Sequence, residues 1–540
     1  MKNILFALLF LTSCTAKPQV LVNQLGHYPD REKIALAEGT FSGMFRVVDE
    51  QTGETVYENT AGETVASPFS GKMLTQLDFT PFNKPGAYRI FTENGNSSPV
   101  FRIDENVLAP LAASALEAFT MQRSEPGHPD TSVMIHASAA SPGRPEGTII
   151  SSPKGWYDAG DYNKYIVNAS YTTGLVLAGY EKYPGYSLND GILEEMMYNL
   201  QWALTMQDPG DGGVYHKLTT PSFEGFVKPE ECKQQRYVVQ KSVTATLDFA
   251  ASMAQAARIF KQFPEYSQTA TTMENAAEYA FQWALDHPDA LYNQFEMNKQ
   301  FDPDVQTGAY GDRSARDEFF WASCELYLTT GKDLYYEKMT EYAPGSFTAP
   351  TWGNVNGLGY FALLTNGKAT ETMKQHVISF CDSIALKAQG AAYASSYGNS
   401  ERDFFWGCLS ESCLGNAISL LYGYELNGNK DYKEQAFHNM DYLLGRNPLG
   451  YCYVTGMGTK SPVNPHHRLA ATDDLHGPLP GFLVGGPNPA EQDGCDYPSD
   501  FPDESYVDVV ESYASNEIAI NWNATLLHLA VALDALSLRL

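Results

Sequence analysis

The stretch VFRIDENVLAPL, residues 100–111, marks the point at which the sequence changes from a strand pattern to a helix pattern. Its first residues alternate apolar and polar side chains, which is typical of a half-buried strand. Residues with a helical pattern follow, and only a short linker separates them from the strand. This change divides the chain at Asp104 into a β-rich region, 18–104, and a helical region, 105–540.

The region before this junction predicts a small immunoglobulin-like β-sandwich. KIALAE (33–38), GMFRVVDEQTGETVYE (43–58), GAYRIFTE (86–93) and PVFRID (99–104) alternate apolar and polar residues, with glycine-containing turns between them. About 85 residues with turns at this spacing fit a sandwich. No cluster of catalytic side chains is visible in it.

The region after the junction predicts helices with a period of 3.6 residues. No strand pattern alternates with them, which argues against a βαβ sheet. About twelve helices in antiparallel hairpins favour six hairpins closed into an (α/α)6 barrel; an open α-solenoid is the alternative, although no sequence repeat is present. The expected helices are 106–122, 164–182, 190–206, 241–261, 266–286, 314–329, 332–342, 357–365, 370–388, 412–426, 431–444 and 515–538.

The composition of the chain limits the classes of ligand and macromolecule that it can bind. The 540 residues include 36 basic and 64 acidic ones and carry a net charge of −28, so a nucleic acid would be repelled. Aromatic residues make up 13%, and clefts rich in aromatic side chains suit flat, amphipathic and uncharged ligands. The chain is expected to be a monomer.

The N-terminus, MKNILFALLFLTSC, resembles a bacterial lipoprotein signal. Lys2 provides a short positive region, Ile4–Leu11 is an apolar run too short to span a bilayer, and Leu11-Thr12-Ser13-Cys14 is a cleavage site. The prediction is a signal and short linker over 1–17, a mature chain that starts at a lipidated Cys14, and a lipid-anchored protein of the bacterial cell envelope, periplasmic or surface-exposed. A plain secretory signal with an incidental cysteine is the alternative.

The long segments between helices hold three clusters of functional side chains. The first, GWYDAGDYNKY (155–165), places Asp158 and Asp161 on a turn, where both could bond one water molecule. A helix-capping turn would explain one aspartate, but it does not explain two aspartates flanked on both sides by aromatic residues.

The second cluster, YVTGMGTKSPVNPHHR (453–468), ends in His466, His467 and Arg468. Paired histidines can ligate a metal, but the i,i+4 spacing is missing. The residues can instead donate hydrogen bonds to hydroxyl groups or form a solvated turn. The third cluster, YVDVVESYASNEIAINWNA (506–524), places Glu517 in the first turn of a helix expected to be capped by Ser515.

These clusters resemble the signatures of glycoside hydrolase family 9, the inverting β-glucanases. The frame Y-x-D-x4-Y-x3-E-x-A-x3-N-A fits Tyr506 to Ala524 without a miss, and V-T-x-x-G-x-K-x4-P-H-x-R fits Val454 to Arg468. VNQLGHYPDREKIAL (22–36) resembles the immunoglobulin-like domain that often precedes such catalytic domains. In this family the catalytic domain is an (α/α)6 barrel.

The resemblance implies roles for individual residues. Asp161 would be the general base, Asp158 its partner on the same water, and Glu517 the general acid. Asp508 would be a supporting active-site carboxylate, and His466 would act beside the cleaved bond. The implied substrate-binding residues are His216, Arg468, Tyr310, Trp352, Trp406 and Trp522, although ordinary core packing would equally account for the last four.

Two departures from the family pattern affect which metal sites are expected. Relatives often carry a Cys/His zinc cluster, but here QRSEPGHPD (122–130) has Ser124 at the expected cysteine, so zinc is not expected. The segment GDRSARDEFFWA (311–322) offers Ser314, Asp317 and Glu318 for a structural calcium, while the acid often found after Trp352 is missing. No metal is required for the bond cleavage itself.

The cleft wall also departs from the family. The usual WGSN reads Trp406-Gly407-Cys408-Leu409, which removes two polar side chains. The leading hypothesis is an inverting endo-β-1,4-glucanase acting on cellulose, mixed-linkage glucan, xyloglucan or glucomannan. The alternatives are an exo-acting or oligosaccharide-trimming enzyme and a non-catalytic glycan-binding lipoprotein.

Overall fold

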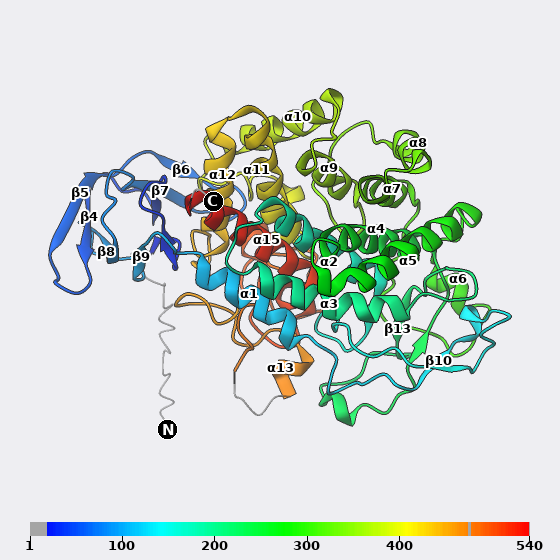
Figure 1. Ribbon diagram of the computed structural model, residues 1–540. Helices are drawn as coiled ribbons and strands as arrows, with labels where there is room; N and C mark the ends of the chain where they lie inside the picture. The colour runs from blue at the N-terminus through cyan, green and yellow to red at the C-terminus, as the bar shows by residue number, and fades with distance from the viewer. Residues whose placement is uncertain (1–18, 473–476, 539–540) are drawn as a thin grey trace, which may run out of the picture.

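The computed structural model describes residues 19–472 and 477–538, and begins with a β-sandwich beside a larger helical domain (Figure 1). Alternate side chains such as Phe45, Val47, Tyr88 and Ile90 are buried between the two sheets, as the sequence pattern predicts. One sheet has the order β1 (Val20–Leu21), β3 (Ile34–Glu38), β7 (Met73–Asp78), β6 (Thr64–Ala66). The other has the order β2 (Gly26–His27), β9 (Phe101–Ile103), β8 (Gly86–Thr92), β4 (Met44–Asp49), β5 (Thr55–Thr60).

The helical domain is a ring of inner helices covered by outer helices, which alternate along the chain. The inner helices are α2 (Ile166–Lys182), α4 (Val243–Phe260), α7 (Arg316–Thr330), α9 (Asn356–Thr365), α11 (Asn416–Asn427) and α15 (Ile520–Leu538). The outer helices are α1 (Ala109–Met121), α3 (Asn189–Thr205), α5 (Ser267–Asp286), α8 (Asp333–Tyr342), α10 (Glu371–Ala388) and α12 (Lys430–Leu443). Because α15 packs on both α2 and α11, the ring closes, which confirms the (α/α)6 barrel over the open solenoid.

Burial along the helices explains their two layers. Helix α4 carries Ala, Met and Phe around its whole circumference. It can therefore be buried on nearly all sides, as expected for a helix in a core. Helix α5 buries only a stripe that includes Ala270, Met273, Ala277 and Ala284, and its other face is solvated. The ring is therefore predicted well by periodicity, because inner and outer helices differ in the width of their apolar face.

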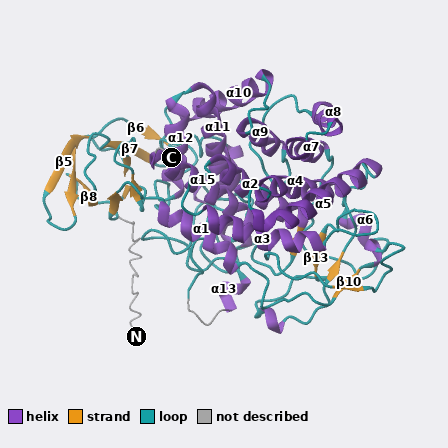
Figure 2. Ribbon diagram, in the orientation of Figure 1, coloured by secondary structure: helices purple, strands orange, loops and turns teal. Residues whose placement is uncertain are grey.

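The long segments between the helices contain structure that the sequence pattern does not reveal. Five short strands between residues 133 and 238 form a small sheet under the barrel; β10 and β13 are labelled among the orange strands of Figure 2. Its order is β11 (Ile149–Ile150), β10 (Val133–Ile135), β14 (Tyr237–Val238), β13 (Lys217–Thr219), β12 (Lys164–Tyr165). Strands of two or three residues are too short to show alternation. The short helices α6 (Gln294–Asn298) and α13 (Arg468–Thr472) also lie in these segments.

The sandwich is joined to the barrel by polar contacts as well as apolar packing. Tyr28 donates a hydrogen bond to Asp534 Oδ1 at 2.5 Å, and Asn23 donates to Asp441 Oδ1 at 2.8 Å. Leu21 of the sandwich belongs to the same apolar cluster as the barrel core. Within the described residues, no helix combines the length and apolar character needed to cross a bilayer.

Candidate active site

A cavity of about 390 Å³ opens at one end of the barrel and gathers side chains from segments far apart in the sequence. Its wall is rich in aromatic side chains, and all of its charged lining residues are acidic. The acidic lining residues are Asp158, Asp161, Glu411 and Glu517; the aromatic ones are Tyr165, Phe223, Tyr310, Trp352, Phe405, Trp406 and Trp522. An uncharged ligand with flat apolar faces fits this lining.

Two backbone segments bring the predicted acid and base together. Ala159 and Ala519 form an antiparallel bridge, and Ile520 N–H donates to the Asp158 carbonyl at 2.9 Å. Glu517 is bridged to His466 on its other side. The aspartate turn, the segment before α15 and the His466 loop therefore lie side by side.

The two aspartates of the turn differ in their bonding. Each oxygen of Asp158 accepts one hydrogen bond, since Asn168 donates to Oδ1 at 2.7 Å and the Tyr310 hydroxyl donates to Oδ2 at 2.7 Å. Asp161 accepts hydrogen bonds on Oδ2 from Asn163 and from the Tyr165 hydroxyl. Its Oδ1 accepts no hydrogen bond from the described part of the chain, so this oxygen is the one available to a water molecule.

Burial and the negative charge of Asp161 raise the pKa of Asp158 to about 8. Lys217 lies close enough to oppose this shift. Burial in turn lowers the pKa of Lys217 to about 7, against the attraction of both aspartates. Its ammonium group donates to the Gly308 carbonyl at 2.6 Å and to Thr307 Oγ1 at 3.0 Å, so it also holds one wall of the cavity.

The structure corrects the expected position of Glu517. The predicted helix 515–538 is broken: α14 (Tyr513–Asn516) ends before Glu517, whose backbone is extended with φ −73° and ψ 155°. Helix α15 begins three residues later, so Glu517 does not lie in the first turn of a helix. Burial, followed by the charges of Asp161 and Asp158, raises its pKa well above the usual range.

His466 and Arg468 lie beside this carboxyl group without lining the cavity. His466 Nδ1 is bonded to the Val510 carbonyl at 2.7 Å, and burial lowers the pKa of its ring. Arg468 donates to the Gly160 carbonyl at 2.9 Å and to the Glu224 carbonyl at 2.8 Å. Both residues therefore fix the loops around Glu517, and the positive charge of Arg468 opposes the rise of the pKa of Glu517.

Two predicted site residues have positioning roles instead of contact with the cavity. His216 is completely buried, and its ring nitrogens are bonded to Ser242 Oγ at 2.8 Å and to the Ala309 carbonyl at 2.7 Å. This arrangement leaves no ring nitrogen for a substrate, so the predicted substrate contact is wrong. Asp508 accepts backbone hydrogen bonds from Val463 and Asn464, both at 2.8 Å, and so anchors the loop that leads to His466.

The four predicted aromatic residues all line the cavity. Tyr310, Trp352 and Trp522 are partly or fully buried, whereas Trp406 is 49% exposed and forms the rim. The backbone of Tyr310 is left-handed, with φ 46°, which is strained for an aromatic residue and frequent at functional sites. This conformation aims its hydroxyl at Asp158.

Sequence reasoning missed several residues of the site. Lys217 directly follows His216, and Asn163 lies within the quoted aspartate stretch, so adjacency to predicted residues was a usable signal. Glu411, Phe223 and Phe405 also line the cavity. No local pattern marks them, since only the fold brings them to the same place.

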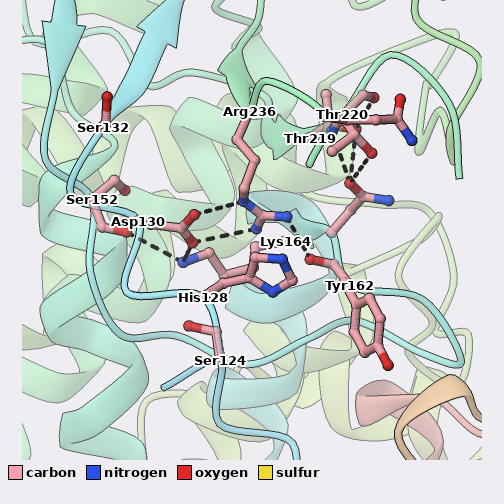
Figure 3. Close-up of polar contacts among 12 residues, drawn as sticks. Ser124, His128, Asp130, Ser132, Ser152, Tyr162, Lys164, Thr219, Thr220 and Arg236 are labelled. Atoms are coloured by element: carbon pink, nitrogen blue, oxygen red, sulfur yellow. Dashed lines mark hydrogen bonds and ion pairs between the residues drawn. The ribbon is translucent and has the colours of Figure 1, made fainter. Parts of the chain in front are cut away.

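The region expected to lack a zinc cluster contains a buried group of charges, shown in Figure 3. Asp130 lies between Lys164 Nζ and Arg236 Nε, each at 2.6 Å from a carboxylate oxygen. Although burial acts in the opposite direction, these two cations lower the pKa of Asp130. Ser124 donates to the Lys154 carbonyl at 2.9 Å. The charged triad joins the segment after α1 to the strand that follows the aspartate turn.

Asp130→Asn should destabilise the protein strongly. It leaves Lys164 and Arg236 buried without a countercharge, for which a loss of about 3–5 kcal/mol in the free energy of unfolding is expected. Asparagine tolerates the left-handed backbone at this position, φ 44°, so the effect reports the charge. Chemical denaturation measures it; the control Glu341→Gln breaks the exposed pair with Lys338 and should cost under about 1 kcal/mol. Equal losses in both variants would contradict a stabilising triad.

The candidate calcium ligands carry suitable oxygen atoms, but these atoms do not surround one point. Asp317 Oδ2 accepts from Val355 N–H at 2.9 Å, and Ser314 Oγ accepts from Arg316 N–H at 3.3 Å. Glu318 is buried, and burial and the charges of Asp248 and Asp317 raise its pKa well above the usual range. Across the described ranges, no group of three or more His, Cys, Asp or Glu side chains is arranged around one point. The fit is therefore partial, and calcium stays a prediction.

Taken together, an (α/α)6 barrel with a glutamic acid of raised pKa and an aspartate pair lining one aromatic-rich cavity defines a glycoside hydrolase. Residues 109–530 match glycosyl hydrolase family 9, and residues 15–97 match the cellulase N-terminal ig-like domain. The chain belongs to glycosyl hydrolase family 9.

Relatives that match nearly the whole chain agree with this assignment. A xyloglucan-specific endo-β-1,4-glucanase of Bacteroides ovatus is 50% identical over 97% of this chain and 95% of its own length. Endoglucanase D of Acetivibrio thermocellus is 31% identical over 94% of this chain and 82% of its own. The solved structure of a Bacteroides ovatus GH9 protein superposes with a TM-score of 0.91, at 49% identity, over 96% of this chain and 99% of that one.

Proposed function

We propose that this family 9 enzyme is an inverting endo-β-1,4-glucanase whose preferred substrate is xyloglucan. The observation that supports it most is that Glu517, with a strongly raised pKa, lines the same cavity as the Asp158–Asp161 pair. The substrate preference rests on the similarity to the xyloglucan-specific relative.

The chemistry divides between the two carboxyl-bearing segments. Glu517, whose raised pKa favours the protonated form, gives its proton to the leaving glycosidic oxygen. Asp161 Oδ1 accepts a proton from the attacking water, and Asp158 shares that water while Tyr310 and Asn168 hold it in place. Because water attacks from the face opposite the leaving group, the anomeric configuration inverts.

A panel of soluble β-glucans tests the proposal. Xyloglucan, mixed-linkage glucan, glucomannan and a soluble cellulose derivative are compared by reducing-end release and by viscosity. Endo-action lowers the viscosity before many ends form, whereas exo-action releases short products with little viscosity change. The highest kcat/KM is expected for xyloglucan; early short products without a fall in viscosity would favour the exo-acting alternative, and binding without release would favour a glycan-binding lipoprotein.

The proposal includes attachment to a bacterial envelope through a lipid on Cys14, which lies outside the described residues. Cys14→Ala should move the protein from the membrane fraction to the soluble fraction, because the thioether that carries the lipid cannot form. Fractionation followed by immunoblotting measures this. A variant that stays with the membrane would contradict the anchor. The monomeric state remains a prediction, which light scattering of the chain without its signal would test.

A further inference from the structure

Glu411 has a carboxyl group in the cavity that takes no part in the proposed acid/base mechanism. It lines the same cavity as Asp161 and Glu517. In the ranges that the structure describes, neither of its oxygens takes part in a hydrogen bond or an ion pair. Its neighbours are engaged elsewhere: Ser410 Oγ bonds Thr525 Oγ1 at 2.9 Å, and the Tyr171 hydroxyl donates to the Pro350 carbonyl at 2.9 Å.

The backbone presents Glu411 in an uncommon way. Residues Leu409–Gly415 form a π-helix that continues directly into α11. Such segments are rare and are often found at functional sites, because the wider turn changes the direction of the side chains. Here the segment buries Leu409 beside Cys408 and places Glu411 on the cavity wall.

The surroundings restrict what Glu411 can bind. Trp352, Trp406 and Trp522 line the same cavity and offer apolar faces for sugar rings, which leave their equatorial hydroxyl groups to be bonded at the edges. A carboxylate accepts strong hydrogen bonds from hydroxyl groups but repels a carboxylate on a sugar. The other charged groups that line the cavity, Asp158, Asp161 and Glu517, are also acidic, so a uronic acid is disfavoured throughout.

We propose that Glu411 is a specificity-determining residue that accepts hydrogen bonds from the hydroxyl groups of a neutral sugar unit bound between the cavity tryptophans. This inference rests on the proposed glucanase function.

The inference gives binding a pH dependence. Burial raises the pKa of Glu411 to about 7, and no charged side chain contributes to the shift; Tyr171 is the titratable group that interacts with it. A group with this pKa is about 10% ionised at pH 6 and about 90% at pH 8. If the ionised form binds the sugar, affinity should rise about tenfold between these pH values.

Equilibrium binding isolates this contact from turnover. Calorimetry measures the Kd of a xyloglucan oligosaccharide in the Glu517→Gln background, which retains Glu411 but cannot protonate the leaving group. Its Kd should fall about tenfold from pH 6 to pH 8. Adding Glu411→Gln should make this change markedly smaller, with the remainder due to Asp158 and Lys217, and should weaken binding more at pH 8 than at pH 6. The matched control Glu401→Gln, an exposed residue of the segment before Trp406, should leave the pH dependence intact.

The outcomes separate the two levels of the proposal. If no β-glucan oligosaccharide binds either protein, the proposed function is wrong. If binding is normal but its affinity is independent of pH, or is unaffected by Glu411→Gln, the role of Glu411 is wrong. Should Glu411→Gln fail to fold, Glu411→Asp keeps the charge on a shorter arm, and it should weaken binding while retaining the pH dependence; unchanged affinity would again contradict the inference.

Discussion

Glu517→Gln should slow the hydrolysis of β-glucan by about 10²–10⁴-fold, the usual contribution of a general acid. The glutamine is nearly the same size and keeps the hydrogen-bonding position beside Gly160, so the change removes only the proton. A sugar hydroxyl is a poor leaving group and needs that proton. An aryl cellobioside with an acidic dinitrophenol leaving group does not, and should lose much less activity.

The comparison of the two substrates is the measurement that matters. Initial rates on xyloglucan and on the aryl cellobioside are determined for the wild type, for Glu517→Gln and for the exposed control Glu511→Gln, which should match the wild type. A loss of equal size on both substrates would contradict the assignment of Glu517 as the acid, because a misfolded or distorted site affects every leaving group alike.

The raised pKa of Glu517 also shapes the pH profile. Burial and the nearby aspartates raise the pKa of the carboxyl group and so favour its protonated form, and activity on β-glucan should fall on the alkaline side when this proton is lost. For the aryl substrate the alkaline fall should be weaker in the wild type, since the leaving group departs as an anion. A profile identical for both substrates would argue that another group controls the alkaline limb.

The fold could be predicted from the sequence because its signals are local. The burial of α4 on nearly all sides and the one-sided stripe of α5 both follow from residue spacing. Ring closure follows less directly, since it depends on α15 packing on α2, although alternating helix hairpins suggested it. Short strands such as β12 depend on partners that are distant in the chain, and no window of two residues can reveal them.

The site was predictable where side chains share a continuous motif. Asp158, Asp161 and Glu517 stand in such motifs and line one cavity. Their electrostatics were not predictable, because the extended backbone at Glu517 replaces the expected helix and changes which charges act on it. His216 shows the opposite case: its sequence context suggests a substrate contact, while Ser242 and the Ala309 carbonyl engage both ring nitrogens.

Asp161→Asn should reduce activity by about 10²–10⁴-fold on both the β-glucan and the aryl cellobioside. No leaving group can replace the activation of water, so the loss should not depend on the aglycone, in contrast to Glu517→Gln. Asparagine can keep the contacts that Tyr165 and Asn163 make with Oδ2, whereas the open Oδ1 position loses its basicity. Initial rates on the two substrates measure the pattern.

Asp158→Asn should give a smaller loss than Asp161→Asn, because Asp158 is already bonded by Tyr310 and Asn168 and only shares the water. The product of the wild type provides the independent check. Water held by these aspartates attacks opposite the leaving group, so the first reducing sugar seen by NMR should have the α configuration. A β product at early times would mean that a carboxylate attacks the sugar directly, and Asp161 could then not be the base that activates water.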